Sequence, residues 1–235
     1  MESFKKWILH ESSKPKSFMG KKIVYVDTKK FRSSSLENQE FCTSGIHEDF
    51  PKSIAEDEIF IDDSLKSEEI PTVLKGIGAR IRDRQNGSSP EKSYENGLRH
   101  ERKIRRKKLH AARRISRYAT LRDSKGKIEV FVVSGEGVRD HYKTDFSQGG
   151  HGYVYDWIPK GEIWLEEEES DEFPAILAHE YAEMVMMRDL GMDYEKAHGI
   201  ASKIEKCLRD KKFGKGDIGN LTKYAYLLTS PSKEV

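Results

Sequence analysis

Six residues in the second half of the chain have side chains that could bind a metal ion or move a proton. They are His151, His179, Glu180, Glu183, His198 and Glu205. Imidazole nitrogens and carboxylate oxygens together suit zinc, iron(II) or manganese(II) better than calcium or a metal that prefers thiolates. The residue types therefore indicate a divalent-metal centre. Zinc is the first choice for the ion, and iron and manganese stay open.

Two helices joined by a short turn are expected to carry most of these side chains. Pro174 suits the first turn of one helix, and Gly191 is the residue type that ends a helix in the left-handed conformation. Asp193 is a good N-cap for a second helix that runs to about Leu208. Such a short connection predicts that the two helices pack antiparallel.

The positions of the candidate ligands relative to this turn place them opposite each other. Glu183 lies eight residues before Gly191 and His198 lies seven after it, whereas His179 lies twelve before and Glu205 fourteen after. Within each helix the two residues are four or seven apart and share a face. At a rise of about 1.5 Å per residue, each pair is level across the hairpin. Two imidazoles and two carboxylates are therefore expected to converge between the helices.

His151 lies outside this hairpin, in a Gly-Gly-His-Gly segment before an expected strand at 162–165. Glycines at such a place let the backbone approach a helix pair closely. His151 is therefore a further candidate, either as an extra metal ligand or as a substrate contact.

The run HEYAE, from His179 to Glu183, resembles the His-Glu-x-x-His motif of the zincin metallopeptidases, with Glu183 in place of the second His. The resemblance implies that His179 is a ligand, that Glu180 is the catalytic general base and that His198 is the downstream ligand. It further implies a peptidase or amidase. The order Gly-Gly-His, His-Glu-x-x-Glu and Ala-His is also similar to that of uncharacterised phage and bacterial proteins.

The chain contains two copies of one pattern at an offset of about 104 residues. Residues 46–61 lie over residues 150–165, and the offset continues into the helical part of each half. A steady offset predicts a tandem duplication of a domain of about 100 residues. We expect a lead-in at 1–21, copy one at 22–122, copy two at 127–229 and a tail at 230–235.

The first copy lacks the chemistry of the second. At the positions of His179, Glu180, Glu183 and His198 the first copy has Gly76, Ile77, Arg80 and Tyr94, whereas Glu101 and His47 keep the types of Glu205 and His151. This pattern predicts one working site, in copy two, and a degenerate site in copy one. Independent drift of two solvated faces is the alternative interpretation.

Each copy is expected to be α+β, with a small, mostly antiparallel sheet packed by a helical hairpin. Strands are expected at 22–26 and 127–133 and around Ile59 and Ile163, and a last helical segment is expected to end near Leu121 or Leu228. The two copies would be related by a pseudo-twofold axis, as in a fused homodimer.

Composition narrows the class of protein. Of the 235 residues, 36% are hydrophobic and 35% are charged, and no apolar run of about 18 residues occurs. The N-terminus lacks the apolar core of a signal peptide. Two cysteines at unmatched positions, Cys42 and Cys207, suggest free thiols in a reducing compartment. We therefore expect no membrane partner and a location in the cytoplasm or in a virion.

The segment from Arg99 to Arg122 has eleven Lys or Arg residues and one acidic residue. Its apolar residues have helical spacing, which predicts a basic amphipathic helix able to neutralise phosphates. The candidate nucleic-acid contacts are Arg102, Arg105, Arg106, Lys107, Lys108, Arg113 and Arg114. The alternative function is therefore a non-enzymatic nucleic-acid-binding or phage virion protein. Its His and Glu residues would then form a structural metal site or an ion-pair cluster, and its partner would be a larger phage or protein assembly.

Overall fold

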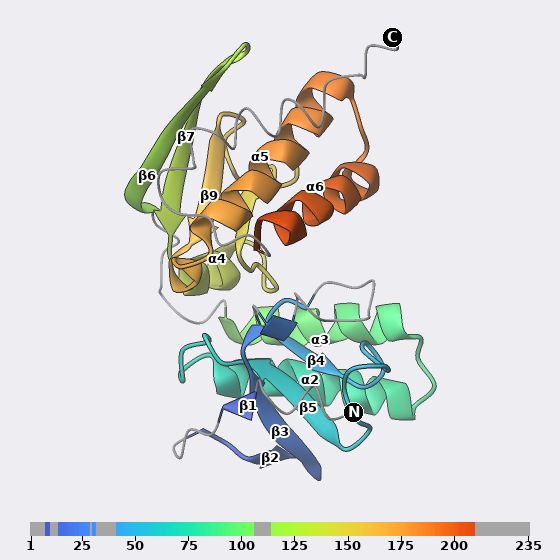
Figure 1. Cartoon of the computed structure of the whole chain (residues 1–235). Helices are drawn as coiled ribbons and strands as arrows, with labels where there is room; N and C mark the ends of the chain where they lie inside the picture. Colours follow the sequence, from blue (N-terminus) through green and yellow to red (C-terminus); the bar gives the residue numbers. More distant parts are fainter. Residues whose placement is uncertain (1–7, 10–13, 29, 32–40, 106–113, 210–235) are drawn as a thin grey trace. The chain divides into compact units, whose positions relative to one another are not determined.

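The computed structural model describes residues 8–9, 14–28, 30–31, 41–105 and 114–209. The chain divides into two compact units (Figure 1). Unit 1 contains residues 1–112 and 136–147, and unit 2 contains residues 113–135 and 148–235. The units therefore cut the chain at other places than the sequence repeat at 22–122 and 127–229. Residues 136–147, which follow a strand of the second copy, belong to unit 1.

Unit 1 contains a five-stranded sheet with helices α2 and α3. Its strands are β1 (Ile8–Leu9), β2 (Ser17–Phe18), β3 (Lys21–Val26), β4 (Ser44–Ile46) and β5 (Glu58–Asp62). Strand β3 pairs parallel with β5, β4 pairs antiparallel with β5, and β1 and β2 pair antiparallel with β3. Helix α2 spans Ile70–Gln85, α3 spans Pro90–Arg105, and α4 spans Gly135–His141. Most of α4 falls within unit 1.

Unit 2 repeats this plan with a four-stranded sheet in the order β6-β7-β9-β8. The strands are β6 (Arg114–Asp123), β7 (Gly126–Val133), β8 (Gly149–His151) and β9 (Glu162–Glu166). After the short 3-10 helix η2 (Glu167–Glu169) come α5 (Phe173–Leu190) and α6 (Tyr194–Arg209). Helix α5 packs against β8 and β9 on one side and against α6 on the other (Figure 1).

The duplicated α+β fold predicted from the sequence is confirmed. In both units the central strand pair is parallel and is flanked by antiparallel strands, and a helical hairpin follows. The sheets are therefore mixed, because the connection from β3 to β5, and from β7 to β9, crosses over to a parallel neighbour. No helix within the described residues is long and apolar enough to cross a membrane.

The predicted basic helix from Arg99 to Arg122 is wrong over its second half. Helix α3 ends at Arg105, and residues 114–123 form β6, which pairs with β7. The helical segment expected to end at Leu121 is wrong for the same reason, because Leu121 lies within β6 and is buried in the core. Pairing along a whole strand outweighed a short helical periodicity. Residues 106–113 and the expected helix end at Leu228 lie outside the described residues.

The helical hairpin of unit 2 forms as its terminal residues indicate. Gly191 has a φ of 63°, and the N–H groups of Gly191 and Met192 both donate to the Met186 carbonyl, which closes α5 with a left-handed C-cap. The Asp193 carboxylate accepts a hydrogen bond from the Lys196 N–H at 3.0 Å and so caps α6. These caps fix the register between α5 and α6.

A Glu–Arg–Glu network occurs at the same place in both units. Arg209, the last residue of α6, contacts Glu172 and Glu205 at 2.6 Å each. Arg105, the last residue of α3, contacts Glu69 at 3.0 Å and Glu101 at 2.8 Å. In each case one Glu precedes the first helix and the other lies on the second, so the arginine ties the two helices together.

In unit 1 this network is larger and more deeply buried. Arg139 contacts Glu69 at 2.8 Å and Asp140 contacts Arg105 at 3.0 Å, which brings residues of α4 into the cluster. The side chains of Glu69, Arg105 and Asp140 are all 0% exposed. Burial alone would raise the pKa of Glu69, but Arg139 and Arg105 outweigh it and lower that pKa. Removal of one arginine would leave buried carboxylates without compensation.

We predict that Arg105→Met lowers the free energy of unfolding by about 3–5 kcal/mol, the usual effect of removing one partner from a buried ion pair. Arg209→Met is the matched control, because Arg209 is 11% exposed and Glu172 is 20% exposed, so water can solvate the carboxylates that it leaves. Urea unfolding of both metal-free variants measures the two losses. An equal or larger loss for Arg209→Met would contradict the account.

Candidate metal centre

Both residue pairs that were expected to lie opposite each other across the hairpin are in contact. Nδ1 of His179 lies 2.7 Å from Oε2 of Glu205, and Nδ1 of His198 lies 2.8 Å from Oε2 of Glu183. The imidazole rings of His179 and His198 meet edge to face, with centroids 4.8 Å apart. The antiparallel hairpin therefore gathers two imidazoles and two carboxylates between α5 and α6.

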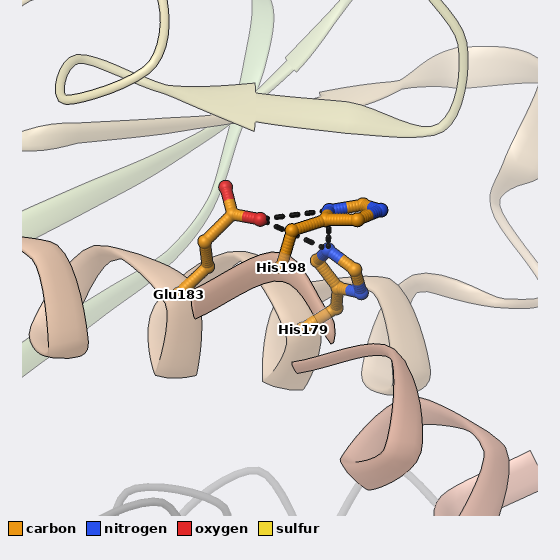
Figure 2. A group of neighbouring side chains, drawn as sticks. All are labelled: His179, Glu183 and His198. Atoms are coloured by element: carbon orange, nitrogen blue, oxygen red, sulfur yellow. Dashed lines mark hydrogen bonds and ion pairs between the residues drawn. The ribbon is translucent and has the colours of Figure 1, made fainter. Parts of the chain in front are cut away.

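Three atoms of this cluster form a compact triangle, which Figure 2 shows. Nε2 of His179 lies 3.2 Å from Nδ1 of His198 and 3.5 Å from Oε2 of Glu183, and the third side is 2.8 Å. Around a tetrahedral zinc ion with bonds of 2.0–2.1 Å, ligand atoms lie about 3.3 Å from each other. The three sides of the triangle bracket this separation. The three side chains thus form one of the groups with metal-binding geometry in the described part of the chain.

Glu205 prepares His179 for this role. Its carboxylate accepts the Nδ1–H of His179, which leaves the Nε2 lone pair of the neutral ring directed at the triangle. Arg209 holds the other oxygen of Glu205 at 2.6 Å. A carboxylate behind a histidine is the usual arrangement around a metal-binding imidazole. The geometry thus places Glu205, a candidate ligand from the sequence, outside the triangle, as the hydrogen-bond partner of His179.

His151 occupies a different position from the triangle. Its ring is 0% exposed, and its Nδ1 accepts a hydrogen bond from the Tyr153 N–H at 3.2 Å. The proton of the neutral ring is therefore on Nε2, which donates to Oε1 of Glu183 at 3.0 Å. His151 orients Glu183 so that Oε2 faces the other two imidazoles. Of the two roles considered for His151, neither describes this contact, which is that of an anchor for the carboxylate.

Glu180 does not belong to the triangle, but it lies next to Glu183. Its carboxylate, together with His151 and Glu183, forms a second group whose polar atoms are all within 4.8 Å of one another. Glu180 is 8% exposed, so it does not point into bulk solvent. The predicted general base is therefore beside the candidate centre without belonging to the triangle.

The electrostatics of the metal-free cluster favour charged groups. Burial lowers the pKa of His179, but hydrogen bonds to Glu183 and Glu205 outweigh it and raise that pKa well above 6.5. Burial would likewise raise the pKa of Glu183, but His151, His179 and His198 together hold it well below its usual range. The carboxylate of Glu183 is thus ionised in a site that contains positive charge.

In unit 1 an arginine fills the equivalent space. The alignment of the helices places Arg80 at the position of Glu183, Tyr94 at that of His198 and Gly76 at that of His179. The Arg80 guanidinium lies 4.7 Å from the centroid of the Tyr94 ring and donates to the Asp49 carboxylate. The remaining cavity has a volume of about 10 Å³, which is at the lower limit for one water molecule. A covalently attached cation therefore occupies the position of the candidate metal.

The strand registers correct one expected equivalence. Ile46 pairs with Ile59 as His151 pairs with Ile163, so Ile46, and not His47, is the counterpart of His151. His47 lies one residue later, where its Nδ1 contacts the Ile54 carbonyl at 2.7 Å. A one-residue slip in this turn reverses the face of the side chain. Unit 1 has therefore lost the anchoring histidine as well.

The predicted nucleic-acid contacts are scattered. Arg105 is wrong as a contact, because it is fully buried in the ionic cluster of unit 1. Arg102 is exposed and donates to the Tyr142 carbonyl, and Arg114 is exposed on β6 and lies 2.8 Å from Glu162. The remaining predicted contacts lie outside the described residues: Arg106, Lys107, Lys108 and Arg113.

Sequence reasoning missed three residues around the centre. Arg209 bridges Glu172 and Glu205. Their signal was present in the repeat, because Arg105 and Glu69 occupy the positions that match Arg209 and Glu172. Tyr194 stacks on the His198 ring with centroids 5.1 Å apart, and it carries no comparable signal in the sequence.

No protein-family model matches this chain, and neither a curated protein nor a solved structure gives a match. The chemistry of the site therefore has to be argued from its own residues.

We predict that the metal-free protein loses stability as the pH rises above about 6.5. The pKa of His179 is raised by folding, so its charged form stabilises the fold below its unfolded value of 6.5, and this contribution disappears as the pH rises through the raised value. Urea unfolding in the presence of a chelator, between pH 6 and 9, measures the effect. His179→Gln should flatten the profile, and two parallel profiles would refute the assignment.

Proposed function

We propose that the second repeat binds one zinc ion and hydrolyses a peptide or amide bond. The ligands are Nε2 of His179, Nδ1 of His198 and Oε2 of Glu183. The single observation that carries this proposal is the triangle of these atoms, with sides of 2.8, 3.2 and 3.5 Å. Two imidazoles and one carboxylate leave the fourth position of a tetrahedral zinc ion available, as catalytic zinc sites require.

The ligand set supports the zincin-like interpretation in spite of the changed motif. Zinc hydrolases of this kind use two imidazoles and one carboxylate. In this chain the carboxylate comes from Glu183 within the motif, and the second imidazole comes from His198 on the next helix. The number of imidazoles and carboxylates is therefore preserved, although they have exchanged positions.

Charge balance also favours a divalent cation. Glu183 is 2% exposed and is surrounded by three imidazoles, and Glu205 adds a second buried carboxylate. In the metal-free protein, protonated imidazole compensates the charge of Glu183, and Arg209 pairs with Glu205. A divalent ion would replace those protons and leave the imidazoles neutral, which is the state in which they bind metals. In unit 1 the Arg80 guanidinium supplies positive charge at the equivalent place.

Glu180 is the proposed general base. A zinc ion in the site would lower the pKa of a bound water to near neutrality and polarise the substrate carbonyl. The Glu180 carboxylate accepts the proton of the attacking water and returns it to the leaving amine. His151 keeps Glu183 in place during these steps, because its Nε2–H holds the oxygen that faces away from the triangle. His151 is therefore a positioning residue.

The non-enzymatic alternative makes different demands. A structural metal site or ion-pair cluster requires His179, Glu183 and His198. Glu180 has no role in it. Nucleic-acid binding through the basic segment stays a prediction, with Arg102 and Arg114 as its exposed candidates. The same pair of variants distinguishes the enzyme from the scaffold.

We predict that Glu180→Gln keeps about one zinc per chain and the wild-type stability, but lowers hydrolysis by at least about 100-fold, the usual contribution of a general base. His179→Ala should lose the zinc as well. Elemental analysis and cleavage of a mixed peptide library measure the two properties. Glu195→Gln, on the exposed start of α6, is the control for an unrelated change of the same type.

Two other results would contradict this proposal. If Glu180→Gln is silent in cleavage while His179→Ala still loses zinc, the site is structural. If the wild-type chain binds no zinc, iron or manganese, the proposal fails altogether.

A further inference from the structure

A cavity of about 340 Å³ opens in unit 2 against α5, the helix that carries His179 and Glu183. Its walls come from the β6–β7 hairpin, from the loop before β9 and from the C-terminal half of α5. The residues that matter for its chemistry are Lys125, Lys127, Tyr153, Lys160, Met184, Arg188 and Asp189. Four of these seven side chains are cationic, and one, Asp189, is acidic.

Two connections link this cavity to the centre. Tyr153 lines the cavity, and its backbone N–H donates to the Nδ1 of His151, the residue that orients Glu183. On α5, Met184 and Arg188 follow Glu180 at intervals of four residues, so they continue the same helix face. At about 1.5 Å per residue, the cavity begins about 6 Å from Glu180 along the helix and extends to about 12 Å.

The cations of the cavity are only partly balanced by carboxylates. Arg188 contacts Asp123 at 2.7 Å and Asp189 at 2.8 Å, and Lys127 forms an ion pair with Glu129. Lys125 and Lys160 are both exposed at the rim. The ammonium group of Lys160 stands 5.3 Å from the centroid of the Tyr153 ring. Two flexible ammonium groups are thus available above a cavity that already contains an arginine.

Unit 1 does not keep this positive charge. The loop register that aligns Glu58 with Glu162 places Glu56 at the position of Lys160. The helix register that aligns Pro71 with Pro174 places Gln85 at the position of Arg188. The strand registers place Gly20 at the position of Lys127. The unit that lacks the metal triangle therefore also lacks the cations.

We propose that this cavity binds an anionic side chain of the substrate, and so selects peptides with an acidic or phosphorylated residue near the bond to be cleaved. This inference rests on the proposed hydrolase function. An extended peptide advances about 3.3 Å per residue, so a distance of 6–12 Å corresponds to about two to four residues. The anionic residue lies that far from the scissile bond, with Lys125 and Lys160 closing over it.

The test measures binding in a chain that cannot turn over. The zinc-loaded Glu180→Gln chain is titrated with the peptide acetyl-Ala-Ala-Ala-Ala-Glu-Ala-Ala-Ala-Ala-amide and with counterparts that carry Gln or phosphoserine at the central position. Blocked ends exclude terminal charges. We expect the Glu or the phosphoserine peptide to bind at least about tenfold more tightly than the Gln peptide. Which of the two binds more tightly distinguishes a carboxylate from a phosphate.

The lysine variants locate the effect. Lys125→Gln combined with Lys160→Gln, added to the same chain, should abolish the preference for the anionic peptides. The matched control is Lys203→Gln combined with Lys206→Gln, which removes the same charge from the exposed face of α6 and should keep the preference. These four lysines are exposed, so the substitutions leave the core intact.

Two results would overturn the proposal: equal binding of the Gln peptide, or a preference that survives the Lys125 and Lys160 substitutions. Failure of the hydrolase proposal looks different. In that case the wild-type chain cleaves none of the peptides, while the anionic preference and its loss with the lysine variants are still observed.

Discussion

Glu183 places an ionised carboxylate in a nearly solvent-free position between three imidazoles, and this charge is the constraint on which the second unit depends. A buried carboxylate is stable only where positive charge and hydrogen bonds replace water. His151 supplies the hydrogen bond from the sheet, and His179 and His198 supply theirs from the two helices. The same carboxylate thereby joins all three elements, and a divalent cation would satisfy it with neutral imidazoles.

The two units have the same helical hairpin, but different side chains supply the positive charge between its helices. Both tie their hairpin with an arginine between two glutamates, Arg105 in one unit and Arg209 in the other. Where unit 2 has the His–Glu triangle, unit 1 has Arg80 stacked on Tyr94. Among the described residues, the groups of side chains that could hold a metal ion lie in unit 2. The contrast extends to the cationic cavity beside α5.

The sequence predicted the parts of the structure that are set by local rules. The α5–α6 hairpin follows from Gly191 and Asp193, and the contacts of Glu183 with His198 and of His179 with Glu205 follow from helical spacing. The pairing of one strand with another could not be predicted from local rules. The predicted helix wrongly includes residues 114–122, because a local periodicity does not detect their pairing with β7. The role of His151 depends on the Tyr153 N–H, which fixes the ring proton and which no residue pattern reports.

Anomalous diffraction at the zinc edge, from crystals of the zinc-loaded chain, tests the central claim most directly. The account predicts one peak in unit 2, at about 2.0–2.1 Å from Nε2 of His179, Nδ1 of His198 and Oε2 of Glu183. It also predicts that His151 keeps its hydrogen bond to Oε1 of Glu183. The absence of a peak within the triangle, or a peak bound to Nε2 of His151 in its place, would contradict the account.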